Sequence, residues 1–284
     1  MRRITLTFIT AAAVALAPAS ASAQSQQIPV PGPILTKLGS TPMVELWDGG
    51  GGLPYLGSAT PYNAGDWENA LRTYHDSGVY TQQIGKVDAV AERWLRRARA
   101  HPRVKYALKR RHRGHGVRIV RSRHQHPRRG HHGRHRGRPA IVFDVDETVL
   151  SNYTAIEADN FTFGPQSQAE AENEIGTAIT PSLELYRLAR NRRIAVFFIT
   201  GRRERTREHT ASNLRREGFT DYEELVLRPN DGTGSTVDYK AGARAAIEDR
   251  GYRILASVGD QYSDLAGGHE QVAFKLPNPF YFLP

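Results

Sequence analysis

The chain of 284 residues contains no cysteine, which excludes disulfide bonds, zinc–thiolate sites, iron–sulfur clusters and cysteine nucleophiles. Hydrophobic residues make up 39% of the chain and 26 glycines add to the apolar share, so the composition is that of a globular protein rather than of a wholly disordered one. A chain of this length predicts one or two domains and is long enough to bury a hydrophobic core.

Acidic residues are absent from one long stretch of the chain. Between Arg93 and Arg138 there are 18 Lys and Arg residues, eight of the 11 histidines, and no Asp or Glu. The rest of the chain carries 21 Lys and Arg against 29 Asp and Glu, a net charge of −8, although the whole chain stands at +10. The positive net charge therefore describes this basic stretch, and alone it does not indicate a nucleic-acid-binding protein.

The N-terminus has the pattern of an export signal. Arg2 and Arg3 precede an apolar segment over residues 4–16, and Ala21-Ser22-Ala23 supplies the small residues of a cleavage site. We predict a signal peptide over residues 1–23, with cleavage after Ala23. The apolar segment is too short for a permanent transmembrane anchor, so the sequence predicts an exported protein, secreted or periplasmic.

Shifts in composition divide the rest of the chain into four parts. Residues 24–65 hold six prolines and eight glycines and predict an extended arm in which helices and long strands are disfavoured. In residues 66–100, apolar side chains recur at spacings of three and four, which predicts a helix that begins at Ser77 and packs on the core. Residues 101–138 combine dense like charges with few large apolar side chains, and we expect a disordered insert.

Residues 139–284 alternate strand-like and helix-like segments. Short apolar runs occupy residues 140–143, 194–199, 225–227, 254–258 and 272–274. Helical patterns lie between them, at residues 181–190, 203–217 and 239–250. Near-continuous apolar strands separated by helices predict an α/β fold whose parallel sheet is covered on both faces. The active site of such a sheet lies beyond the carboxyl ends of its strands.

Carboxylates, a hydroxyl, a backbone amide and a lysine follow the predicted strands: Asp144 and Asp146, Thr200 and Gly201, Asp260 and Asp264, and Lys240. Carboxylates gathered at one edge repel one another unless a cation neutralises them, and an all-oxygen set of ligands suits Mg²⁺. One carboxylate can then attack phosphorus to give an aspartyl-phosphate, while a second protonates the leaving oxygen and later activates water. Thr200, the Gly201 amide and Lys240 would hold the non-bridging phosphate oxygens.

Four motifs of this region occur in order: Asp144-Val-Asp-Glu-Thr-Val-Leu-Ser-Asn152, Tyr239-Lys240 with Arg244, Gly259-Asp-Gln-Tyr-Ser-Asp-Leu265 and Phe274-Lys-Leu-Pro-Asn-Pro279. Together they resemble the haloacid dehalogenase-like (HAD) superfamily, and in particular its secreted acid phosphatases of class B and C and the plant vegetative storage proteins. The resemblance covers roughly residues 66–284 apart from the basic stretch. It implies a Rossmann-like core with a small helical lid, drawn from residues 66–100 and 152–178, in place of a large cap domain.

The resemblance also implies a role for each carboxylate. Asp144 would be the nucleophile and Asp146 the general acid and base. Asp144, Asp260 and the backbone carbonyl of Asp146 would bind Mg²⁺, and Asp264 would be a further ligand or a neighbour of the ligands. From its position alone, Asp264 could equally cap the next helix.

The same resemblance helps to assign roles to four further residues. Thr200 and Lys240 would bind phosphate. Arg202 and Arg244 have two open interpretations, substrate binding or pairing with acidic neighbours.

These observations predict an exported, Mg²⁺-dependent phosphomonoesterase acting on a small phosphomonoester. One alternative is a basic secreted polyanion-binding protein on a vestigial phosphatase scaffold, and another is an enzyme that transfers phosphate to an alcohol. Residues 93–138 are a candidate contact for a polyanion such as nucleic acid, an anionic cell-wall polymer or membrane headgroups, and their histidines are a candidate for transition-metal binding.

Overall fold

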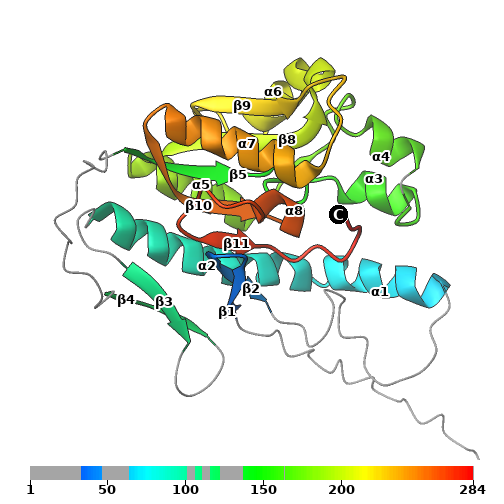
Figure 1. Ribbon diagram of the computed structural model, residues 1–284. Helices are drawn as coiled ribbons and strands as arrows, with labels where there is room; N and C mark the ends of the chain where they lie inside the picture. Colours follow the sequence, from blue (N-terminus) through cyan, green and yellow to red (C-terminus); the bar gives the residue numbers. More distant parts are fainter. Residues whose placement is uncertain are drawn as a thin grey trace, which may run out of the picture.

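A computed structural model describes residues 33–46, 64–100, 106–110, 116–121, 137–162 and 164–283. The expected signal peptide, residues 1–23, lies outside the described residues. A seven-stranded sheet forms the centre of the molecule, in the order β1-β2-β11-β10-β5-β8-β9 (Figure 1). Its strands are β1 (Pro33–Leu38), β2 (Thr41–Leu46), β5 (Arg138–Phe143), β8 (Ala195–Arg203), β9 (Glu224–Arg228), β10 (Tyr252–Gly259) and β11 (Ala273–Lys275).

The sheet is parallel apart from the antiparallel pair β1–β2, and all five strands predicted in residues 139–284 belong to it. The helices predicted between them are also present, as α5 (Thr180–Asn191), the 3₁₀ helix η1 (Glu204–Thr206) with α6 (Arg207–Arg216), and α7 (Thr236–Asp249). The predicted α/β fold with a largely parallel sheet is therefore confirmed.

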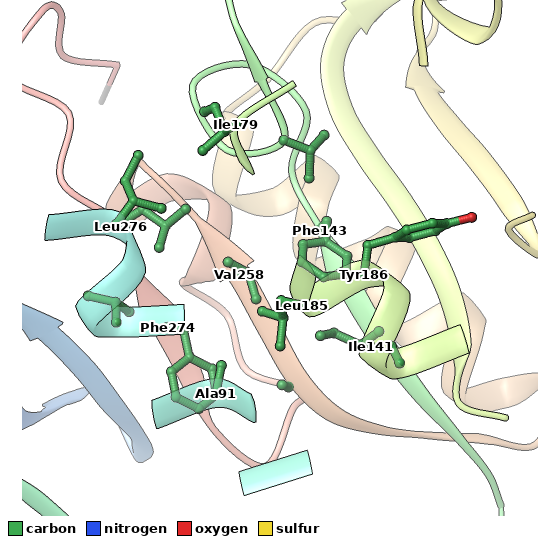
Figure 2. Close-up of a cluster of buried hydrophobic side chains, with 14 of the residues drawn as sticks. Ala91, Ile141, Phe143, Ile179, Leu185, Tyr186, Val258, Phe274 and Leu276 are labelled. Carbon is green, nitrogen blue, oxygen red and sulfur yellow. The ribbon is translucent and has the colours of Figure 1, made fainter. Parts of the chain in front are cut away.

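Alternate residues of the central strands pack into two separate hydrophobic layers. Ile141 and Phe143 of β5 belong to the larger cluster, with side chains of α5 and of α2 (Val79–Ala100), as Figure 2 shows. Ala140 and Val142 belong to a second cluster on the α7 side of the sheet. This period of two explains why the strand sequence is apolar at every position: both of its faces are covered.

The segment 66–100 forms two helices rather than one. α1 (Ala64–Asp76) ends at Ser77, whose amide donates to Thr73 O at 3.0 Å, so Ser77 closes α1 and does not begin the next helix as predicted. α2 then packs against strands of the sheet, and the indole of Trp94 donates to Leu255 O at 2.8 Å. α2 therefore covers a face of the sheet. α1 instead contacts α3 (Tyr153–Ala158), where Arg72 Nε donates to Glu157 at 3.1 Å and the His75 ring stacks on Tyr153.

Residues 150–178 lie at the carboxyl edge of the sheet (Figure 1). They form β6 (Leu150–Ser151), α3 (Tyr153–Ala158), α4 (Pro165–Ala169) and β7 (Thr177–Ala178), with β6 and β7 paired antiparallel. This small helical segment is consistent with the fold expected from the resemblance.

Two segments expected to lack regular structure form hairpins where they are described. In the Pro- and Gly-rich arm, β1 and β2 add to the main sheet, where Val44 is fully buried beside Phe274 of β11. In the basic insert, β3 (Tyr106–Arg110) pairs with β4 (Val117–Arg121), and Leu108 and Val117 are buried in the main core. Burial of a few apolar side chains against an existing core outweighs local composition, since strand preference depends strongly on packing context. The remainder of both segments lies outside the described residues.

Among the described residues, none of the helices combines the length and apolar character that crossing a bilayer requires.

Asp88 provides a test of how α2 and α5 pack. Its buried carboxylate accepts one hydrogen bond from Ser182 Oγ of α5 (3.1 Å), and its Oδ1 has no partner. Burial raises the pKa of Asp88 from 3.8 to about 7. The folded state therefore holds this proton more tightly than the unfolded state does, and stability falls as pH rises from about 4 to 7.

We predict that Asp88→Asn removes this penalty. Relative to wild type, the variant should be more stable at pH 8 than at pH 5 by about 2 kcal/mol, measured by urea unfolding at both pH values. A stability difference that is the same at the two pH values would contradict the assignment.

Candidate active site

The carboxyl ends of three adjacent strands bring the predicted residues to one site. Asp144 follows β5, Thr200 lies near the end of β8, and Asp260 follows β10. These three side chains are 6%, 0% and 1% exposed, so the site is recessed into the edge of the sheet. The backbone amide of Asp144 donates to Val258 O at 2.9 Å, which extends the β5–β10 pairing up to the carboxylate.

Lys240 joins two of the carboxylates. It lies in the second turn of α7, which begins after Ser235, whose hydroxyl accepts from the Asp238 amide at 3.0 Å. Its buried Nζ donates to Asp144 Oδ1 and, at 2.6 Å, to Asp264 Oδ1. Burial alone would lower the pKa of Lys240, but the two carboxylates outweigh burial and raise it. The lysine is therefore a permanent cation beside Asp144.

Three buried carboxylates gather around this lysine. Oxygen atoms of Asp144, Asp260 and Asp264 lie within 4.8 Å of one another. The hydroxyl of Thr148 spans the first two, at 3.3 Å from Asp144 Oδ2 and 3.1 Å from Asp260 Oδ1. Burial and the neighbouring Asp264 raise the pKa of Asp144, and the same two causes raise the pKa of Asp260 to about 6. One ammonium group leaves this cluster with an excess of negative charge.

The carboxylate cluster fits a divalent cation by its chemistry. It offers only oxygen ligands, it is buried, and a dication would offset the repulsion that raises the two pKa values. Asp264 has a second task, since its Oδ2 accepts from the Gln261 amide at 2.8 Å and closes a capping box on α8 (Tyr262–Leu265). Both oxygens of Asp264 therefore accept hydrogen bonds from the protein, one from Lys240 and one from the Gln261 amide. We assign Asp264 mainly to holding these neighbours in place.

Asp146 lies outside the three-carboxylate cluster and faces Arg202. Its Oδ1 accepts from Arg202 Nη2 (2.6 Å), Arg202 Nε (2.9 Å) and Asn152 Nδ2 (2.9 Å), and its Oδ2 accepts from Thr200 Oγ1 at 3.4 Å. Burial would raise the pKa of Asp146, but the Arg202 guanidinium and the hydrogen bonds outweigh burial and lower it. The two aspartates of the first motif therefore sit in opposite electrostatic environments.

Gly201 leaves the space beside Thr200 open. It is exposed, and a Cβ atom built on it would meet nothing within 4 Å. The backbone at this position therefore has open space beside it. Thr200, Gly201 and Asp146 thus lie together at the end of β8.

Glu147 and Arg244 serve the scaffold around the site. Glu147 is fully buried with a positive φ of 51°, and its carboxylate accepts from Tyr80 Oη at 2.9 Å and from the Asn152 amide at 2.5 Å. Burial raises its pKa to about 8. Arg244 pairs with Glu270 at 3.0 Å and donates to three backbone carbonyls in and just after α8, those of Asp264, Ala266 and Gly268. Of the two interpretations that the sequence left open for Arg244, the contacts favour pairing.

Several contacts of the site have no clear signal in the sequence. Thr148 and Asn152 lie in the first motif, but spacing alone does not show that they contact Asp260 and Asp146. Asn278 lies in the last motif and donates to Asp260 Oδ2 at 2.7 Å. This contact forms because the C-terminal segment passes the end of β10, which the sequence does not show.

Comparison with known proteins identifies the family. Residues 79–284 match the HAD superfamily, subfamily IIIB (Acid phosphatase), and the chain belongs to this subfamily. The resemblance noted in the sequence is therefore confirmed. The fold is similar to that of the class C acid phosphatase from Bacillus anthracis, with a TM-score of 0.54 and 16% identity over 76% of this chain and 86% of that one.

Three plant proteins are similar in sequence. Acid phosphatase 1 of Solanum lycopersicum is 39% identical over 153 residues, covering 52% of this chain and 60% of that protein. Stem 28 kDa glycoprotein of Glycine max is 34% identical over 151 residues, covering 50% and 59%. Vegetative storage protein 1 of Arabidopsis thaliana is 30% identical over 150 residues, covering 50% and 55%. The matched region thus spans less than two thirds of the length of these relatives.

We predict that the carboxylate cluster binds a divalent cation in the folded state. Millimolar Mg²⁺ should raise the melting temperature of wild type, because a ligand that binds only the folded state stabilises it. Asp260→Asn should abolish this increase. Asp249→Asn, which removes an exposed carboxylate at the other end of α7, should retain it. An equal response to Mg²⁺ in all three proteins would show that the cluster is not the binding site.

Proposed function

We propose that this chain is a Mg²⁺-dependent acid phosphatase that hydrolyses small phosphomonoesters through an aspartyl-phosphate on Asp144. The observation that carries the proposal is the contact of Asp144 with Lys240 inside a cluster of three buried carboxylates. A nucleophilic oxygen, a fixed cation and a set of oxygen ligands therefore occupy one recess. Membership of the acid phosphatase subfamily supports the same reading.

In this proposal the phosphate group is held by residues at two strand ends. Lys240, the Thr200 hydroxyl and the Gly201 amide bind its non-bridging oxygens, on which negative charge is concentrated in the transition state. Lys240 suits this role because its raised pKa keeps it charged. Asp264 also accepts from the lysine, at 2.6 Å, and so helps to hold it in position.

Asp144, Asp260 and the backbone carbonyl of Asp146 would hold the Mg²⁺, with Asp264 beside them. When bound, the ion would neutralise the carboxylates and stabilise charge on the transferred phosphoryl group. Thr148 lies between Asp144 and Asp260 and shares its single hydroxyl proton with them.

Asp146 would act in both half-reactions. An oxygen of Asp144 attacks phosphorus, the bond to the leaving oxygen breaks, and Asp146 delivers a proton to that oxygen. Water then attacks the phosphorus of the aspartyl-phosphate, Asp146 takes its proton, and Asp144 is released with inorganic phosphate. Arg202 favours ionised Asp146, so it assists the second half-reaction, in which Asp146 accepts a proton.

Two alternatives to hydrolysis make different predictions. A vestigial scaffold that only binds polyanions agrees with the storage proteins among the relatives. Transfer of phosphate to an alcohol would use the same aspartyl-phosphate, and added glycerol would then yield glycerol phosphate. The glycoproteins and storage proteins among the relatives are consistent with export of this chain after removal of residues 1–23.

Hydrolysis of p-nitrophenyl phosphate tests the proposal. Wild type should turn over with Mg²⁺ and lose activity in EDTA, and Asp144→Asn should fall by about 10³-fold or more because no nucleophile remains. Asp249→Asn should match wild type. Circular dichroism and urea unfolding of both variants would show that they are folded.

The proposal fails if folded wild type shows no turnover with Mg²⁺ between pH 4.5 and 8, or if Asp144→Asn keeps wild-type activity. The first result would favour the vestigial scaffold, and the second would place the nucleophile elsewhere.

A further inference from the structure

Positive charge gathers at the edge of the molecule opposite the candidate active site. We define the cationic face by seven residues from the end of α2, the β3–β4 hairpin and the turn between α5 and β8: Arg96, Arg97, Arg99, Lys109, Arg118, Arg192 and Arg193. The turn leads into the amino end of β8, whereas the active-site residues follow the carboxyl ends of the strands. Figure 1 shows the hairpin beside the last turns of α2, far from α1 and α8.

Hydrogen bonds hold the three parts of the cationic face together. Arg97 Nη1 donates to Ile119 O of β4 at 2.6 Å, and Arg99 Nε donates to Arg192 O at 3.3 Å. The acceptors are backbone carbonyls, which carry no net charge. These contacts position the guanidinium groups without neutralising them.

Most cations of this face have no carboxylate partner among the described residues, unlike the arginines near β9. Near β9, Arg138 pairs with Glu223, Arg190 with Asp221 and Arg250 with Glu224. Within the cationic face, the described residues form one ion pair, between Arg96 and Glu92. The face therefore retains most of its positive charge, whereas each of these three arginines near β9 is paired with a carboxylate.

Two cations of the hairpin lie directly opposite each other. Lys109 and Arg118 are register partners in the antiparallel ladder, and both are exposed. Like charges at directly opposed positions destabilise a strand pair. Burial of Leu108 and Val117 offsets this cost. Repulsion between cations also affects the neighbouring Arg253, whose pKa is lowered by burial and by the charge of Arg99. An anion bound across the hairpin would relieve this repulsion.

We propose that the cationic face binds the phosphate backbone of double-stranded nucleic acid, independently of base sequence. Its charges are spread over three elements, which fits a regular array of phosphates better than one small anion. The exposed large hydrophobic residues of the described chain are Ile175, Tyr262, Phe282 and Leu283, and none belongs to this face. Insertion into a membrane therefore lacks the apolar contact that usually accompanies a basic patch.

Stacking on unpaired bases also lacks support on the described part of this face. Trp94 is only 3% exposed, and its indole N–H is engaged by Leu255 O. Contacts to the backbone rather than to bases are the mode that remains, and duplexes present phosphates at the higher charge density. Since the face lies at the opposite edge from Asp144, binding would leave the candidate active site open to solution.

Fluorescence anisotropy of the full chain with a labelled 20-base-pair DNA duplex tests this inference across a series of salt concentrations. Lys109→Gln/Arg118→Gln should weaken binding and lower the slope of log affinity against log salt by about 2, since about one counterion is released per phosphate contact. Arg215→Gln/Arg216→Gln, which removes the same charge from exposed positions on α6, should leave that slope unchanged.

A third variant keeps the test valid if the hairpin variant does not fold. Arg193→Asn removes one charge from a turn whose backbone is left-handed (φ 55°), a conformation that Asn tolerates well. It should lower the salt slope by about 1. Hydrolysis of p-nitrophenyl phosphate by the same preparations reports the proposed activity separately, and it should not change in any of these variants.

Three results would overturn the inference. The first is no duplex binding by wild type at low salt. The second is an equal loss of affinity in the hairpin and α6 variants, which would indicate an effect of net charge alone. The third is tighter binding to vesicles containing anionic phospholipid, or to single-stranded DNA, than to the duplex.

Discussion

Three buried carboxylates share one ammonium group, and this imbalance of charge is the constraint on which the site depends. Lys240 pairs with Asp144 and Asp264 but not with Asp260, which accepts hydrogen bonds from Thr148, Gln261 and Asn278 and is also stabilised by the charge of Lys275. Buried ions of like sign are costly unless further positive charge is supplied. The dication and the phosphate group of the proposed reaction would supply and use the charge that this imbalance requires.

The fold creates this arrangement by its order of strands. β5 lies between β10 and β8, so the carboxylates after β5 and β10 and the hydroxyl at the end of β8 meet at neighbouring positions. Coverage of the sheet on both faces keeps water from the strands and limits access to their carboxyl edge. Asp146 pairs with Arg202, which gives it an electrostatic environment different from that of the carboxylates beside Lys240. The cationic face lies away from the carboxyl ends of the strands, so the proposed binding and the proposed chemistry would not compete for space.

The sequence predicted the site best where an apolar run marks a strand and a polar residue directly follows it. Apolar runs such as residues 140–143 predict strands, and the strand-end rule then places Asp144, Thr200 and Asp260 together. The hairpins were not predictable, because Val44 and Leu108 are stabilised by a distant part of the core rather than by their Pro- or Arg-rich surroundings. The pairing of Arg202 with Asp146 also joins residues far apart in the chain, and no spacing reveals it. Ser77 was misread because the same residue types end one helix and begin another.

Chemical trapping of the aspartyl-phosphate tests the central claim most directly. Borohydride added during turnover of a phosphomonoester with Mg²⁺ reduces an acyl phosphate to the alcohol, which converts the phosphorylated aspartate to homoserine. Mass spectrometry of the digested protein should then find homoserine at position 144, only when substrate and Mg²⁺ are both present. Homoserine at another carboxylate, or turnover that leaves every aspartate unmodified, would contradict the assignment of Asp144 as the nucleophile.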